Sequence, residues 1–90
     1  MDKIDIIALA KKKSKKRGIS EERIMETLQS PGQTVEGYGG RKVAQRKYMV
    51  DQKEYLLRVV YEEESQGVKV VTCYRTSQVK KYWREEKNED

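Results

Sequence analysis

The 90-residue chain contains no histidine and no phenylalanine, and it has one proline and one cysteine. Without histidine it lacks the commonest general acid–base group and the commonest ligand of transition metals. A single cysteine excludes an intrachain disulfide and a zinc site built from cysteines. Any catalysis must therefore use arginine, lysine, tyrosine or carboxylate groups, and we expect no metal and no cofactor.

Long apolar runs are missing as well. The apolar stretch at residues 4–10 is far too short to cross a bilayer, for which about 20 residues are needed. No basic segment precedes this stretch and no small-residue cleavage site follows it, so it does not match the pattern of a signal peptide. We expect a cytoplasmic protein that makes no membrane contact.

The chain has enough residues for one small core. A domain of this length buries only about 60–70% of the surface of its unfolded chain. Charged residues make up 39% of the chain, and its aromatic residues are six tyrosines and Trp83. Because tyrosine keeps a polar tip, we expect several tyrosines at the edge of this core.

Positive charge is in excess and unevenly distributed. The net charge is +5; residues 1–17 carry seven basic and two acidic side chains, and residues 41–60 carry six and two. Residues 18–40, in contrast, carry one basic and four acidic side chains. An excess of this kind favours polyanionic partners. If the fold brings the two basic blocks together, they form one basic face.

The N-terminal third of the chain has the pattern of two helices. We expect the first from Asp2 or Lys3 to Arg17, apolar in its first half and basic in its second. Gly18 is placed to end it in a left-handed conformation, and Ser20 to cap the next helix.

After Pro31, which ends the second helix, the hydrophobic period changes to two and predicts strands. The expected strands are at residues 34–36 and 42–50, followed by a hairpin of residues 55–61 and 68–75. In this hairpin Tyr61 is expected to pair with Val68, across a loop that contains the three acidic residues Glu62, Glu63 and Glu64.

These elements predict a single α+β domain. Two N-terminal helices, within residues 1–30, would pack on an antiparallel sheet of three or four strands, within residues 33–76. Residues 77–90 would form a short C-terminal helix or tail, ordered from Gln78 to Glu86.

The basic run of the first helix is the first candidate site. Its six cations, within a seven-residue segment that rises about 10 Å as a helix, suit successive phosphates of a nucleic acid. Such contacts fix position and affinity but not sequence preference. The alternative is a solvated helix end that the helix dipole stabilises. The residues concerned are Lys11, Lys12, Lys13, Lys15, Lys16 and Arg17.

The strands supply a second candidate site. Phosphodiester cleavage without histidine or metal needs cations on the pentacoordinate phosphate, and a lysine, tyrosine or carboxylate to move protons. On one face of the expected sheet the catalytic candidates are Arg58, Arg75, Lys47 and Tyr82 or Tyr74, and Arg46 is a further contact for nucleic acid. The alternative for Arg75 is a cross-strand ion pair with Glu54, which lies opposite it in the expected register.

The C-terminal segment combines lysines and aromatic residues. Lys80 and Lys81 are candidate contacts for nucleic acid, and Tyr82 or Trp83 has the chemistry to stack on a base. For Trp83 we favour the alternative, in which it closes the core as this segment docks. Cys73, which has no histidine to activate it, is expected to be a core residue.

Five short motifs resemble a small prokaryotic family known only as a domain of unknown function. Members carry an Arg-Gly-Ile-Ser junction between helices and a last strand of the Val-Val-Thr-Val-Tyr type. The resemblance covers roughly residues 4–84. The motifs are Arg-Gly-Ile-Ser-Glu-Glu at residues 17–22, Pro-Gly at 31–32, a glycine-rich turn at 37–40, Leu-Leu-Arg-Val-Val-Tyr at 56–61 and Val-Val-Thr-Cys-Tyr at 70–74.

The architecture of that family is similar to BrnT and, more distantly, to RelE/ParE-type toxins. This implies an antiparallel-sheet protein that cleaves RNA or poisons a nucleic-acid enzyme, and that an antitoxin protein neutralises. The spacing of Arg75 and Tyr82 looks like that of the arginine and C-terminal aromatic of BrnT-type sequences. Where the family has His-Ala, eight residues before its Arg-Gly-Ile, this chain has Leu9-Ala10. If that histidine is catalytic in relatives, this chain is inactive or uses another group.

Two hypotheses of function follow. In the first, the protein is an RNA-binding toxin, a metal-independent ribonuclease of a toxin–antitoxin pair. In the second, it is a non-catalytic binding module of the same fold, whose basic face binds nucleic acid or an acidic protein. The expected partners are RNA or another polyanion and, under the first hypothesis, an antitoxin protein.

Overall fold

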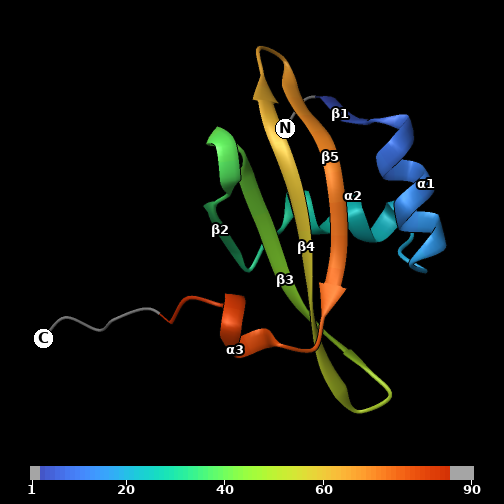
Figure 1. Cartoon of the computed structure of the whole chain (residues 1–90), viewed down its shortest axis with the longest axis vertical. Coiled ribbons are helices and arrows are strands. Elements are labelled where there is room, and N and C mark those ends of the chain that lie inside the picture. Colours follow the sequence, from blue (N-terminus) through green and yellow to red (C-terminus); the bar gives the residue numbers. More distant parts are fainter. Residues whose placement is uncertain (1–2, 86–90) are drawn as a thin grey trace, which may run out of the picture.

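The computed structural model describes residues 3–85, which form one five-stranded sheet with three α-helices (Figure 1). The order of strands across the sheet is β1-β5-β4-β3-β2, and all neighbours are antiparallel except β1 and β5, which are parallel. The elements are β1 (Lys3–Ile6), α1 (Ala8–Lys16), α2 (Glu21–Gln29), β2 (Gln33–Glu36), a 3-10 turn (Tyr38–Gly40), β3 (Lys42–Val50), β4 (Lys53–Glu64), β5 (Gly67–Thr76) and α3 (Val79–Tyr82).

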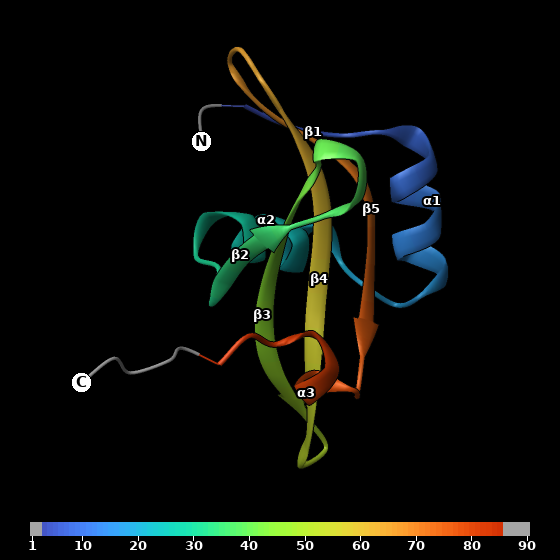
Figure 2. The same cartoon turned by 60° about the vertical axis from the view of Figure 1, so that its left-hand side comes forward.

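Helices α1 and α2 cover one face of the sheet, and the C-terminal segment with α3 lies against the other (Figure 2). This confirms the predicted α+β class and the packing of both N-terminal helices on the sheet. The predicted sheet of three or four antiparallel strands is wrong, because within residues 3–85 the sheet has five strands and is mixed.

The predicted first helix is too long at its N-terminal end, since the segment before Ala8 forms strand β1. Ile4 and Ile6 are β-branched, which favours a strand, and they pair along the edge of β5. Gly67 permits this pairing, because a Cβ built there would lie 1.9 Å from the Lys3 carbonyl oxygen. Asp2, the alternative first residue of that helix, lies outside the described residues.

The junction between α1 and α2 matches the prediction. Gly18 has a φ of 72°, the left-handed conformation that glycine adopts without steric cost. The Ser20 side chain accepts a hydrogen bond from the Arg23 backbone N–H at 3.2 Å and so caps α2. Ile19 and Ile24, on either side of this cap, are both buried.

The register predicted for the β4–β5 hairpin is wrong by two residues. Val68 pairs with Glu63 rather than with Tyr61, which pairs with Val70. Strand β4 continues to Glu64, so two residues rather than six join the strands. The acidic residues assigned to a solvated loop therefore lie in the strand, where Glu62 and Glu63 make ion pairs with basic side chains.

A β-bulge then changes which side chains of β5 face the helices. The register shifts between Val60 and Tyr61, so that Val59 pairs with Cys73 and Leu57 with Arg75. Cys73 is fully buried under α1 and α2, as expected for a core residue. The predicted pairing of Glu54 with Arg75 is wrong, because Arg75 lies opposite Leu57.

The main core lies between the two helices and the sheet. Each side chain of Val or Ile size that is fully buried there contributes about 1.5–3 kcal/mol. The buried residues of this core are Ile6, Ala10, Ile19, Ile24, Leu28, Ala44, Leu57, Val59, Tyr61, Val68, Val70 and Cys73.

No helix in residues 3–85 is long and apolar enough to cross a membrane.

Candidate nucleic-acid interface

The cations of α1 are exposed because the other side of this short helix packs on the sheet. Ala10 and Ser14 are buried, and the Ser14 hydroxyl donates to the Lys11 carbonyl at 3.0 Å. The side chains that point outward carry only positive charge over the second half of the helix. In the described part of the chain, none of these cations pairs with a carboxylate; they are Lys11, Lys12, Lys13, Lys15, Lys16 and Arg17.

Arg17 connects this run to the sheet. Its guanidinium donates to the Cys73 carbonyl on β5 at 2.7 Å, which fixes the arginine at the end of α1. Burial raises the pKa of the Cys73 thiol, and the charge of Arg17 opposes this only in part. The next residue, Gly18, approaches Arg75: a Cβ built on the glycine would lie 3.9 Å from an arginine nitrogen.

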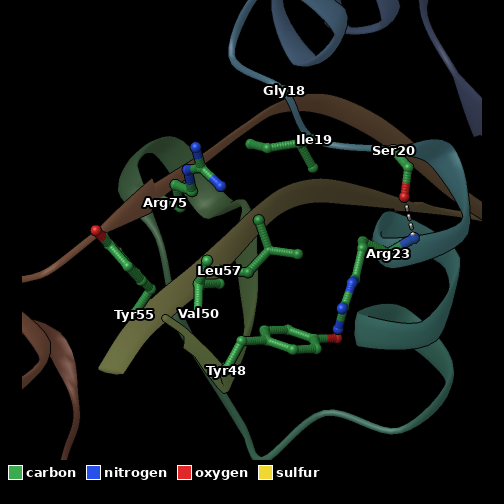
Figure 3. Close-up of a pocket in the computed structure, with 9 residues that line it drawn as sticks. All are labelled: Gly18, Ile19, Ser20, Arg23, Tyr48, Val50, Tyr55, Leu57 and Arg75. Atoms are coloured by element: carbon green, nitrogen blue, oxygen red, sulfur yellow. Dashed lines mark hydrogen bonds between the residues drawn. The ribbon is translucent and has the colours of Figure 1, made fainter. Parts of the chain in front are cut away.

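A cleft of about 230 Å³ opens beside this junction (Figure 3). Arg75 and Tyr55 stand on one side, Tyr48 and Arg23 on the other, with Leu57 between them. No acidic side chain is among its lining residues, which are Gly18, Ile19, Ser20, Arg23, Tyr48, Val50, Tyr55, Leu57 and Arg75.

Arg75 is exposed, and it makes no ion pair with any carboxylate of residues 3–85. Its guanidinium carbon lies 5.7 Å from the centroid of the Tyr55 ring. The bulge in β5 is the reason that Arg75 reaches this cleft, since without the extra residue its side chain would point to the opposite face.

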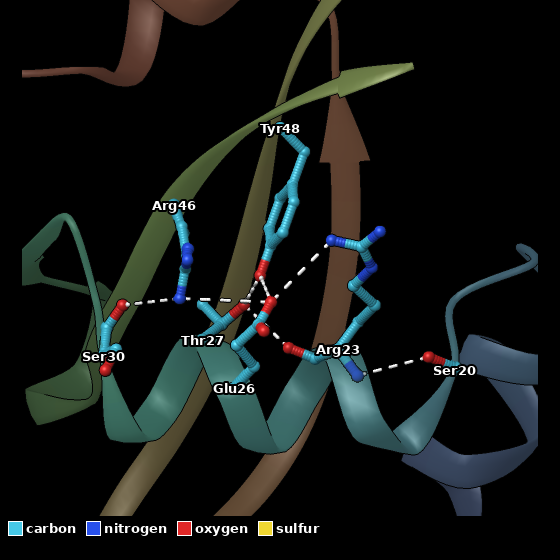
Figure 4. A network of polar contacts seen from close by, with 7 residues as sticks. All are labelled: Ser20, Arg23, Glu26, Thr27, Ser30, Arg46 and Tyr48. Carbon is cyan, nitrogen blue, oxygen red and sulfur yellow. Dashed lines mark hydrogen bonds and ion pairs between the residues drawn. The ribbon is translucent and has the colours of Figure 1, made fainter.

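The wall formed by Tyr48 is a network of polar contacts (Figure 4). The Tyr48 hydroxyl donates to the Glu26 carboxylate at 2.8 Å, and the ring stands between Arg23 and Arg46, at 4.4 and 5.4 Å from its centroid. Glu26 also lies 3.7 Å from Arg23 and 3.9 Å from Arg46. One carboxylate shared by two guanidinium groups leaves this wall net positive.

Arg58 occupies the opposite face of the sheet, under the C-terminal segment. Its Nε donates to the Gln45 side-chain oxygen at 2.9 Å, and its terminal nitrogen donates to the Tyr74 hydroxyl. Its guanidinium carbon lies 4.3 Å from the centroid of the Tyr82 ring. Gln45 is fully buried, and its amide nitrogen donates to the Gln33 side chain at 2.8 Å and to the Tyr82 carbonyl at 3.1 Å.

Lys47 lies on this second face too, with its ammonium 4.2 Å from the centroid of the Trp83 ring. Trp83 is partly buried and packs over Gly32, where a Cβ would lie 2.8 Å from the ring. The C-terminal segment thus docks on the sheet through Trp83, while the ring keeps some exposure. Lys80 and Lys81 are exposed on α3 and are separated from the α1 run by the sheet.

The four catalytic candidates do not share one face, so that part of the prediction is wrong. The structure brings together Lys47, Arg58 and Tyr82 around the docked C-terminal segment. It places Arg75 on the helix-covered face, together with Arg46. The register shift at the bulge causes this division, and neither composition nor alternation reveals a bulge of this kind.

Sequence reasoning missed three contributors to these two faces. Two of them are Tyr48 on β3 and Tyr55 on β4, which line the cleft and lie opposite each other in the strand register. Gln45, which organises the opposite face, follows two buried residues of β3, Val43 and Ala44. A polar residue in an otherwise apolar strand centre is a signal for a buried hydrogen-bond network, and it identifies Gln45 in retrospect.

Among residues 3–85 no three His, Cys, Asp or Glu side chains are grouped to hold a metal ion. Comparison of the chain with protein-family models, curated proteins and solved structures gives no match. The resemblance to the toxin-like family therefore stays a prediction from short motifs.

Proposed function

We propose that the protein is an RNA-binding module of RelE/BrnT-like type that uses the outward side of α1. The observation that carries the proposal is the set of exposed cations at residues 11–17, which have no carboxylate partners among the described residues. Like charges four residues apart on a helix repel one another. A polyanion removes this repulsion, and the release of its counterions drives binding.

A second basic cluster of the chain differs from this one. Arg41 lies 3.1 Å from Glu62 and Lys42 lies 3.0 Å from Glu63, while Lys69 lies 3.9 Å from Glu62. The hydrogen bond and the charge of Glu63 raise the pKa of Lys42. These cations are already compensated within the protein, so they have less to gain from phosphates than those of α1.

The geometry favours binding over cleavage. Of the predicted catalytic groups, Arg58 lies over the ring of Tyr82 and Lys47 over that of Trp83, both in the C-terminal segment. The hydrogen bonds of Arg58 go to Gln45 and Tyr74 of the sheet.

Arg75, on the opposite face, has no lysine or carboxylate among the residues that line its cleft. Of the two tyrosines there, Tyr48 already donates its hydroxyl proton to Glu26, and Tyr55 has no general base among the lining residues. We therefore propose the non-catalytic hypothesis for this chain in preference to the ribonuclease.

The test is the salt dependence of affinity for a single-stranded RNA. Replacing Lys12, Lys13, Lys15 and Lys16 by Gln should weaken binding and flatten the plot of log affinity against log salt. Each lost phosphate contact on a single strand changes that slope by about 0.7. The RNA should remain intact on a gel throughout.

The matched control replaces the paired cations Arg41, Lys42 and Lys69 by Gln, and we expect it to keep the wild-type slope. The same affinity and slope in the α1 variant as in the wild type would refute the proposal. Cleaved RNA would restore the ribonuclease hypothesis. Preferential binding of an acidic protein would replace RNA as the partner.

A further inference from the structure

We infer that the cleft between Arg75 and Arg23 receives one unstacked nucleotide of the bound RNA, and so selects single strands. The inference rests on the proposed function, whose phosphate contacts on α1 do not require the cleft. It assigns to the cleft the recognition of a base and its phosphate, whereas α1 supplies affinity that is independent of sequence.

The size of the cleft sets what can enter. Its volume is about 230 Å³. That space suits one base with part of its sugar and phosphate, and it is below the ~300–1,000 Å³ of pockets for drug-sized ligands. A base pair does not fit, so a duplex would have to stay outside.

The lining has the chemistry of a nucleotide site. Leu57, Ile19 and Val50 supply apolar surface. The guanidinium groups of Arg75 and Arg23 present planar donor pairs that match phosphate oxygens. No lining carboxylate opposes an anion, although Glu26 compensates part of the charge of Arg23 from behind the Tyr48 wall.

Of the two tyrosines, Tyr55 is the better stacking surface. Arg23 approaches the Tyr48 ring to 4.4 Å, and Figure 4 shows Arg46 on its other side. The cations nearest to Tyr55 are farther away, at 5.6 Å for Lys53 and 5.7 Å for Arg75. A base that enters beside Tyr55 has the ring as a stacking partner and Arg75 within reach of its phosphate.

The cleft is continuous with the basic run. Arg17 ends the run and is fixed to β5, and the next residue, Gly18, lines the cleft. An RNA strand with its phosphates along α1 therefore reaches the cleft at the end of the helix. In A-form duplexes the bases are stacked and paired, whereas a single strand can place one base out of the stack.

The experiment titrates the full-length protein with 5′-AMP and follows backbone amide shifts by NMR. We expect shifts at Gly18, Leu57 and Arg75. Replacing Tyr55 by Leu should weaken the binding of 5′-AMP by about fivefold or more, the lower end of the effect of losing one base–aromatic stack. Replacing Arg75 by Gln should also weaken it, because the charge-assisted contact to the phosphate is lost. Thermal unfolding of each variant checks that it is folded.

Matched controls come from the opposite end of the sheet. Arg41→Gln removes an exposed arginine that is paired with Glu62, and Tyr38→Leu removes a tyrosine that is 96% exposed. Both should bind 5′-AMP as the wild type does. The α1 variant with four Lys→Gln changes should also keep this binding, because a mononucleotide has no run of phosphates.

The two proposals fail in different ways. If RNA binding depends on α1 but 5′-AMP shifts no cleft residue, the nucleotide site is refuted and the proposed function stands. If 5′-AMP binds in the cleft while the α1 variant keeps full RNA affinity, the proposed function of α1 is refuted and the nucleotide site in the cleft stands. Equal binding of inorganic phosphate and 5′-AMP, or of duplex and single-stranded RNA, would also overturn the inference.

Discussion

Arg58 and Arg75 lie on neighbouring strands of the same sheet, but they point to opposite faces and have different surroundings. Arg58 is enclosed by Gln45, Tyr74 and Tyr82, and two of its nitrogens donate hydrogen bonds. Arg75 is exposed at the rim of a cleft and has no ion pair within residues 3–85. One arginine holds the C-terminal segment in place; the other is open to a ligand.

The two arginines have the same charge and differ in their partners, and this difference is why we propose different roles for them. In the described part of the chain, every buried polar side-chain atom has a hydrogen-bond partner, and the network of Gln45 and Arg58 is an example on the second face. A satisfied network of this kind stabilises a unique packing but has few groups left for a substrate.

The same substitution at both arginines should give the largest difference. Arg58→Gln shortens the side chain and leaves Gln45 without its donor in a buried position, so we expect a loss of about 1–3 kcal/mol in the free energy of unfolding. Arg75→Gln changes an exposed side chain, and its effect on stability should stay within about 0.5 kcal/mol. Denaturant unfolding with a common slope m measures both.

The same two substitutions should affect RNA affinity in the opposite order to stability. Arg75→Gln should weaken the binding of single-stranded RNA, while folded Arg58→Gln should keep it. If Arg58→Gln were as stable as the wild type and also deficient in RNA binding, the two faces would have to exchange their assigned roles.

A smaller effect is expected on the stability of the α1 run itself. Lys11 and Lys15, and likewise Lys12 and Lys16, are like charges four residues apart, and each such pair destabilises a helix by about 0.2–0.5 kcal/mol. Raising the salt concentration should therefore stabilise the wild type slightly and the variant with four Lys→Gln changes less. Thermal unfolding at about 0.05 and 0.5 M salt tests this, since salt screens exposed charges. If salt stabilised the variant more than the wild type, the lysines of α1 would not be destabilising the helix by repulsion.

The local patterns predicted well those elements that their own residues determine. The Ser20 cap, the Gly18 turn and the strand at residues 42–50 are local signals, and each is in the structure. Strand β1 is different: its residues fit a helix or a strand, and the edge of β5 beside Gly67 decides between them.

The candidate site was predicted only in part for the same reason. The basic run is visible in the sequence because its residues are adjacent. The cleft joins residues from α2, β3, β4 and β5, and Arg75 belongs to it only through a bulge of one residue. A shift of one residue reverses the face of every side chain that follows, and alternation alone does not reveal such a shift.

The most direct test of the division between the two faces is to map a bound RNA on the protein by NMR. Titration with a short single-stranded RNA should shift the amides of α1, Gly18 and Arg75, and should leave the signals of Lys47 and the Trp83 indole unchanged. Shifts that centre on Lys47, Tyr82 and Trp83, with α1 unaffected, would contradict the account.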